Sequence, residues 1–149
     1  MLLLLSVIFL VACAKSASEA QLPANSALAE AYAAEDADSG LYNVFNGSSW
    51  KTAAVKVADK TYTVAGYRDE YGAEDTNKID YFIELSMTGT GSAQTKAGDY
   101  VTGNYDVVNK TLIIKNSETD EAFIQAEISH DGLVSFPGEE GITIYLEQE

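Results

Sequence analysis

Hydrophobic and polar residues alternate along most of the chain after residue 47, and this alternation predicts β-strands. The clearest case is the segment 79–87. Its apolar positions would share one face of a strand: Ile79, Tyr81, Ile83, Leu85 and Met87. Glu84 lies between them and would face solvent. Because successive side chains of a strand point to opposite faces, the segment predicts a strand with one buried face.

The same pattern predicts a series of short strands joined by tight turns. The expected strands cover residues 50–57, 60–64, 100–108, 111–115, 121–129, 133–136 and 142–148. Asn109-Lys110 would join two of them as a hairpin, and Asp131-Gly132 is a type I′ turn signal. Gly89-Thr90-Gly91 would end the 79–87 strand. Short sequential connections favour an antiparallel meander, which hides its edges best by closing. The expected fold is therefore all-β, a small antiparallel barrel of about eight short strands.

Two segments lack this alternation. Residues 65–78 are polar and predict a loop or a short helix. Residues 14–40 are rich in Ala, Ser and Glu, which is typical of a stalk. A helix over 26–37 is expected within it, with Asn25 or Ser26 as N-cap and Gly40 as its stop. A helix of that length is marginal in water on its own, so we expect it to be loosely attached.

The N-terminus has the character of a targeting signal. Residues 2–12 form a nearly unbroken apolar run, which is shorter than the roughly 20 residues of a transmembrane helix and fits the core of a secretory signal. The run ends in Leu10-Val11-Ala12-Cys13, which resembles the lipobox of bacterial lipoproteins. The resemblance implies cleavage before Cys13, a lipid on its thiol, and a membrane-anchored extracytoplasmic protein. The expected organisation is a signal peptide at 1–12, a stalk at 13–40 and a barrel at 41–149.

Charge excludes one class of partner. The 149 residues include 23 Asp and Glu against 9 Lys and Arg, a formal net charge of -14. Such a chain repels phosphate backbones, so we expect no binding to nucleic acid. Cys13 is the single cysteine, so no intramolecular disulfide can form.

Side chains suited to catalysis or metal binding are sparse. The single histidine, His130, falls in a predicted turn, and an acylated Cys13 would not act as a nucleophile. Zinc sites need three or four ligands that this chain does not supply. The acidic groups around Asp75 and Glu118 lack the glycine and distal glutamate of a calcium loop. We therefore expect no enzymatic activity, no catalytic residue, no metal site and no cofactor.

The 65–78 insertion holds the candidate ligand-binding residues. Tyr67 and Tyr71 are four positions apart, and Arg68, the single arginine, lies beside them. Tyrosine combines an apolar body with a polar tip, and arginine offers a planar fork of donors to a carboxylate. These three residues could cover the mouth of a barrel that binds an amphipathic anion. The alternative is that the two tyrosines close the end of the barrel core.

Several short motifs, in order along residues 41–149, resemble the lipocalin-like domains of small bacterial lipoproteins. They are Gly47-Ser48-Ser49-Trp50, Gly89-Thr90-Gly91, Gly103-Asn104-Tyr105, Leu112-Ile113-Ile114, Asp131-Gly132-Leu133 and Ile142-Thr143-Ile144-Tyr145. True lipocalins have Gly-x-Trp at the first strand, whereas this chain has Gly-x-x-Trp. The resemblance implies a lipocalin-like barrel and an extracytoplasmic location, and it assigns no catalytic residue.

Two functions remain open at this point. The barrel could bind a small apolar or amphipathic ligand near the membrane. Alternatively, a filled barrel could act as a structural or protein-interaction module of the cell envelope. An eight-stranded barrel is just wide enough for either.

Overall fold

The computed structural model describes residues 20–149 of the chain. Cys13 and the expected signal peptide lie outside these residues. The elements are α1 (Ser26–Tyr32), α2 (Ala37–Phe45), β1 (Ser49–Val57), β2 (Lys60–Thr63), α3 (Val64–Tyr71), α4 (Ala73–Ile79), β3 (Tyr81–Leu85), β4 (Thr90–Thr95), β5 (Tyr100–Val108), β6 (Thr111–Asn116), β7 (Ala122–Ile128), β8 (Val134–Pro137), a short 3-10 turn (Glu139–Gly141) and β9 (Ile142–Gln148).

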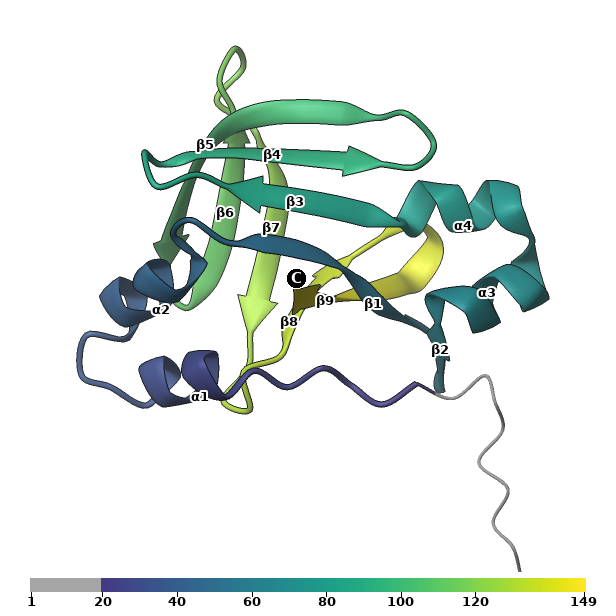
Figure 1. The fold of residues 1–149 in the computed structure, drawn as a ribbon, viewed down its shortest axis with the longest axis horizontal. Coiled ribbons are helices and arrows are strands. Elements are labelled where there is room, and N and C mark those ends of the chain that lie inside the picture. Colours follow the sequence, from purple (N-terminus) through teal and green to yellow (C-terminus); the bar gives the residue numbers. More distant parts are fainter. Residues whose placement is uncertain (1–19) are drawn as a thin grey trace, which may run out of the picture.

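All the strands except β2 form a closed antiparallel barrel (Figure 1). From β3 to β9, each strand pairs with the next one along the chain, and β1 closes the ring by pairing with both β3 and β9. β2 pairs with the second half of β1, from Ala54↔Thr63 to Val57↔Lys60, and stays outside the ring. The expected all-β antiparallel barrel is confirmed.

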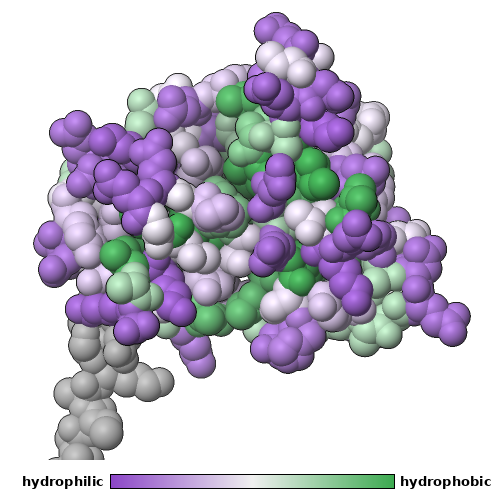
Figure 2. All heavy atoms as spheres, turned by 180° about the vertical axis from the view of Figure 1, so that it is seen from behind, coloured by the Kyte–Doolittle hydropathy of each residue, from purple (hydrophilic) through white to green (hydrophobic). Residues whose placement is uncertain are grey.

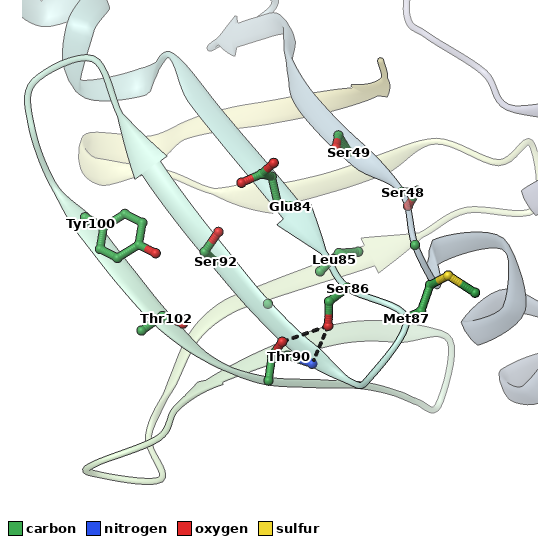
Figure 3. Close-up of a pocket in the computed structure, with 12 residues that line it drawn as sticks. Ser48, Ser49, Glu84, Leu85, Ser86, Met87, Thr90, Ser92, Tyr100 and Thr102 are labelled. Atoms are coloured by element: carbon green, nitrogen blue, oxygen red, sulfur yellow. Dashed lines mark hydrogen bonds between the residues drawn. The ribbon is translucent and has the colours of Figure 1, made fainter.

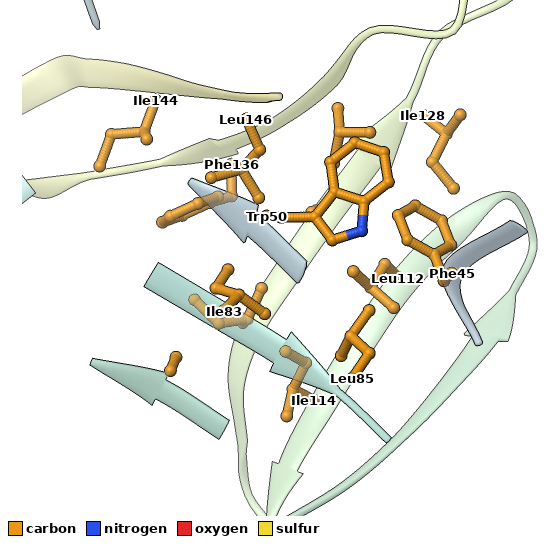
Figure 4. Close-up of a cluster of buried hydrophobic side chains, with 14 of the residues drawn as sticks. Phe45, Trp50, Ile83, Leu85, Leu112, Ile114, Ile128, Phe136, Ile144 and Leu146 are labelled. Atoms are coloured by element: carbon orange, nitrogen blue, oxygen red, sulfur yellow. The ribbon is translucent and has the colours of Figure 1, made fainter. Parts of the chain in front are cut away.

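Large apolar side chains fill the barrel interior (Figure 4). Six of them, contributed by β1, β3, β6 and β9, are at most 1% exposed: Trp50, Ile83, Leu112, Ile114, Ile144 and Leu146. Leu85 and Phe136 lie in the same cluster. Inward and outward residues alternate along these strands, as the sequence pattern requires. The interior is thus a packed core.

Short helices lie at both ends of the strands, with α1 and α2 at one end and α3 and α4 at the other (Figure 1). At the first end, Phe45 of α2 is fully buried, and its ring centroid lies 5.1 Å from that of Trp50. The Trp50 indole N–H donates to Ser48 Oγ at 2.7 Å. Leu28 of α1 and Leu41 of α2 are also fully buried. The helices therefore extend the barrel core beyond the strands.

The expectation of one loosely attached helix over 26–37 is wrong. Two helices form, and both bury apolar side chains. Asn25 is the N-cap as predicted, since its side chain accepts from the Leu28 N–H at 3.0 Å. Gly40 does not stop a helix but lies inside α2, where a Cβ atom would come within 3.3 Å of the Ala31 Cβ. The glycine allows α1 and α2 to approach each other closely, and the boundary expected at residue 41 falls within α2.

The 65–78 insertion is helical, which was one of its two predicted forms. Thr63 caps α3, its hydroxyl accepting from the Gly66 N–H at 2.9 Å. Gly72, with φ at +91°, separates α3 from α4. Residues with a Cβ atom rarely adopt such a backbone angle, so a glycine suits this break between the two helices.

Most strands lie close to their predicted positions, with β5 and β9 matching the expected bounds. Three details differ. Ile79 ends α4, and Met87 is 79% exposed because the chain turns after β3. Residues 90–95 form β4, a strand that the sequence pattern did not predict.

The two predicted hairpin turns differ in type. Asn109 and Lys110 both have positive φ, as a type I′ turn requires. At Asp131-Gly132 the type I′ prediction is wrong, because only Gly132 has positive φ. There the Gly132 N–H donates to the Ser129 carbonyl at 2.9 Å.

Candidate functional site

The tyrosines proposed as a ligand lid belong to an aromatic cluster at the α3 end of the barrel. Tyr67 and Tyr71 have ring centroids 4.6 Å apart, and Tyr62 of β2 lies 6.1 Å and 5.8 Å from them. Tyr67 is 4% exposed and Tyr71 is 41% exposed. Burial, followed by the charge of Asp75, raises the pKa of Tyr67. Tyr67 is thus part of the core.

Arg68 is on the same helix, but its side chain is exposed to solvent. Its neighbours Asp69 and Glu70 are exposed as well. The structure therefore brings Tyr67 and Tyr71 together, adds Tyr62 to them, and places Arg68 on an acidic surface.

A different site lies on the outside of the barrel, where β1, β3, β4 and β5 form a hollow of about 500 Å³ (Figure 3). We call it the outer groove. Its lining residues are Gly47, Ser48, Ser49, Glu84, Leu85, Ser86, Met87, Thr90, Gly91, Ser92, Tyr100 and Thr102. Its volume falls within the range of about 300–1,000 Å³ that is usual for small-molecule sites.

Strand register builds the floor of the outer groove. Ser49 pairs with Glu84, Glu84 with Ser92, and Ser92 with Thr102, which gives one row across four strands. Their sequence neighbours point the other way, into the core, as Trp50 and the other inward residues do. Figure 3 shows Glu84, Ser92 and Tyr100 on the same side of the sheet. Because side chains alternate along each strand, this polar row faces outward while the other face of the same strands is apolar.

Hydrogen bonds fix one end of the outer groove. Ser86 Oγ lies 2.7 Å from Thr90 Oγ1 and 3.0 Å from Thr88 Oγ1. The Thr90 N–H donates to the same Ser86 oxygen at 3.1 Å. By contrast, the Ser92 and Thr102 hydroxyls have no side-chain hydrogen bond to any other residue within 20–149. The turn end is thus preorganised, while the floor keeps hydroxyls available.

Two exposed side chains with large apolar bodies flank the groove. Tyr100 is 63% exposed and Met87 is 79% exposed. Glu84 is the one charged residue in the lining, and no Lys, Arg or His is among the lining residues. The groove therefore offers hydroxyls, one carboxylate and one accessible aromatic ring.

A second hollow, of about 370 Å³, lies between the α1–α2 connection and the β5–β6 turn. One of its three carboxylates is already paired, because Asp38 accepts from the backbone N–H groups of Asn109 and Lys110 at 2.9 and 2.8 Å. Lys110 Nζ also lies 4.0 Å from the centre of the Tyr32 ring. These contacts dock α1 and α2 against the β5–β6 turn.

Figure 2 shows the molecule from behind, with hydrophobic residues in the middle of this face and hydrophilic ones around them. Within residues 20–149, no three His, Cys, Asp or Glu side chains gather closely enough to hold a metal ion. No helix in the same range has the length and apolar character needed to cross a membrane.

Comparison with known proteins adds no functional assignment. No protein-family model and no curated protein matches the chain. An NMR structure of a protein from Burkholderia xenovorans is similar at 15% identity and a TM-score of 0.42, covering 91% of this chain and 96% of that one. A likeness at this level carries no argument about activity.

Proposed function

We propose that this chain is a lipid-anchored extracytoplasmic protein whose barrel binds its ligand on the outer surface and not in an internal cup. The observation that carries the proposal is the packed interior, where Trp50, Ile83 and Leu146 occupy the space that a ligand would need. The helices at both ends add further buried side chains. The accessible hollow of about 500 Å³ lies outside, over β1, β3, β4 and β5.

This proposal favours a binding module over the other classes. A cup for an apolar ligand requires a hollow interior lined by apolar groups. The outer groove is lined mainly by hydroxyls, which suits recognition of a polar ligand by hydrogen bonds. No serine or threonine hydroxyl of its lining is hydrogen-bonded to the Glu84 carboxylate, as a covalent nucleophile would be to its base. Binding without chemistry is the function that these residues support best.

The membrane anchor is supported by the sequence Leu10-Val11-Ala12-Cys13. A lipid on Cys13 would hold the domain at the membrane surface, where stable attachment takes two acyl signals or more. Replacing Cys13 tests this directly. The Cys13→Ala variant should accumulate as an unprocessed precursor or leave the membrane fraction, as measured by cell fractionation and by the mass of the protein.

The matched control is Ser16→Ala, a similarly small change close to the same junction. It should be processed and retained like the unmodified chain. Normal processing and full membrane retention of the Cys13→Ala variant would contradict the anchor.

A further inference from the structure

We propose that the outer groove is a binding site for a neutral oligosaccharide. This inference rests on the proposed function, since it names the class of ligand for the same outer surface. Four features of the groove carry it: the spacing of its hydroxyls, its single carboxylate, its exposed aromatic ring and its lack of cations.

The hydroxyls of Ser49, Ser92 and Thr102 lie in one row across β1, β4 and β5, with Glu84 of β3 in the same row. Neighbouring strands are about 4.8 Å apart, so these groups repeat at a spacing close to the length of one sugar ring. A serine or threonine hydroxyl both donates and accepts. Each can therefore match a sugar hydroxyl in either orientation, and Ser92 and Thr102 have no competing side-chain hydrogen bond within residues 20–149.

Glu84 supplies the one strong acceptor. An ionised carboxylate has two oxygens that only accept, and bonds to it are about twice as strong as neutral ones. Adjacent hydroxyls of a sugar can donate to both oxygens at once. Glu84 makes no ion pair with any residue within 20–149, so its carboxylate is available for this role.

Tyr100 supplies an apolar surface at the edge of the row. Tyr100 is 63% exposed although it is a large aromatic residue on a regular strand. Sugars have C–H faces that pack on aromatic rings, while the tyrosine hydroxyl remains available to bond. Figure 3 shows the Tyr100 side chain on the same side of the sheet as Ser92 and Glu84. One sugar residue can thus lie on Tyr100 while the next reaches Ser92 and Glu84.

Charge narrows the ligand class further. The lining has one negative group and no positive one, and the whole chain carries a formal charge of -14. Phosphates, carboxylates and anionic lipid head groups would be repelled. The lining is also too polar for an alkyl chain. A neutral polyhydroxylated chain fits both conditions.

The test uses the full lipidated chain, purified in a detergent without a sugar head group, and isothermal titration calorimetry. The probes are cellotetraose, maltotetraose and chitotetraose as neutral oligosaccharides, and tetragalacturonate as the anionic comparison. We expect at least one neutral probe to bind and tetragalacturonate to bind at least tenfold more weakly. If no neutral probe binds at millimolar concentration, or if the anionic probe binds as well as the neutral ones, the proposal is wrong.

Variants locate the binding. Tyr100→Ala should raise the Kd about tenfold and Glu84→Gln about fivefold, through loss of the stacking face and of the charged acceptor. The matched controls are Tyr71→Ala, an exposed tyrosine at the α3 end, and Glu127→Gln, an exposed glutamate on β7. Both should leave the Kd within about twofold. Equal effects of the groove variants and their controls would overturn the assignment.

A last arm separates this inference from the proposed function. A full chain with the photo-crosslinker p-benzoylphenylalanine in place of Gln94, the neighbour of Tyr100 across β4 and β5, is irradiated in intact cells. Capture of a glycan supports both statements. Capture of a protein overturns the oligosaccharide assignment but keeps the outer surface as the binding face. No adduct at all, together with no binding of the neutral probes, overturns both the oligosaccharide assignment and the outer surface as the binding face.

Discussion

Tyr105 joins three elements through one buried ring. From β5 it stacks on Tyr42 of α2, with ring centroids 5.3 Å apart and 19° between the planes. Its hydroxyl donates to the Ser86 carbonyl beyond β3 and accepts from the Asn46 amide at 2.9 Å. Burial, with the neighbouring Tyr42, raises the pKa of Tyr105 to about 12 from its ordinary 10.0.

This shift predicts how stability depends on pH. Between about pH 10 and 12 the folded state holds the Tyr105 proton more firmly than the unfolded state does, so stability falls as the pH rises. The stabilisation that comes from the raised Tyr105 pKa is complete below about pH 10 and is lost as the pH rises through about 12. Tyr105→Phe should lower the free energy of unfolding at pH 7 by about 1–3 kcal/mol, because both part-buried hydrogen bonds of the hydroxyl are lost.

The same variant should show a smaller fall in stability between pH 8 and pH 11.5 than the unmodified chain. Denaturant unfolding at the two pH values measures it. Some alkaline dependence will remain, since burial also raises the pKa of Tyr67 and Tyr81. An unchanged fall in the variant would show that Tyr105 does not contribute.

Leu85 and Glu84 are sequence neighbours on opposite faces of β3. Leu85 is 2% exposed, whereas Glu84 faces solvent. Leu85→Ala should lower the free energy of unfolding by about 2–5 kcal/mol. Glu84→Ala should change it by no more than about 0.5 kcal/mol. Thermal or denaturant unfolding compares them, and similar losses at both positions would contradict the strand register.

At the scale of elements, Asp38 holds α2 against the β5–β6 turn. Its two carboxylate oxygens accept from consecutive backbone N–H groups, those of Asn109 and Lys110. Asp38→Ala should cost about 1–2 kcal/mol of stability, because two charge-assisted bonds, one of them part-buried, are lost. The matched control is Asp36→Ala, since Asp36 makes no side-chain capping bond to α2. Hydrogen exchange at Asn109 and Lys110 should accelerate in the first variant alone.

The elements that the sequence predicted well are those with large apolar residues at every second position. The inward positions Tyr105, Val107, Leu112 and Ile114 defined β5 and β6 in this way. β4 lacks that signal because its inward residues are Gly91, Ala93 and Thr95. A Cβ on Gly91 would come within 3.1 Å of Leu85 and 3.3 Å of Ile114. Because Leu85 and Ile114 fill the space beside Gly91, β4 needs no large inward residues, and its sequence shows no apolar alternation.

At the scale of the whole molecule, the packed interior predicts that apolar ligands do not enter. A fluorescent fatty acid or anilinonaphthalene sulfonate should show no saturable binding to the folded chain beyond that of the buffer or detergent alone. The interior has no room for a ligand of that size next to Trp50 and Phe45. Native mass spectrometry after purification provides the second readout, and a co-purified fatty acid would contradict the filled barrel.

The outer groove could not be predicted from the sequence, because no local motif contains it. Its floor combines Ser49, Glu84, Ser92 and Thr102, which are separated by many residues and meet only through strand register. The prediction centred on Tyr67 and Tyr71 recognised their contact, since an i,i+4 pair on a helix faces one side. Whether such a pair covers a cavity or packs on a core depends on the interior beneath it, which sequence alone does not specify.

The position of β2 outside the ring has a consequence for self-association. Closed barrels leave no free strand edges. β2, however, lies outside the ring and pairs with β1 along one edge, and no strand within residues 20–149 pairs with its other edge. The chain just before α1 runs past this side, where the Ala20 N–H donates to the Thr61 carbonyl at 3.1 Å. A fragment trimmed to residue 41 would lose this cover and the buried Leu28 together. It would present a bare strand edge to its own copies, so aggregation of such a fragment would reflect the trimming and not the barrel.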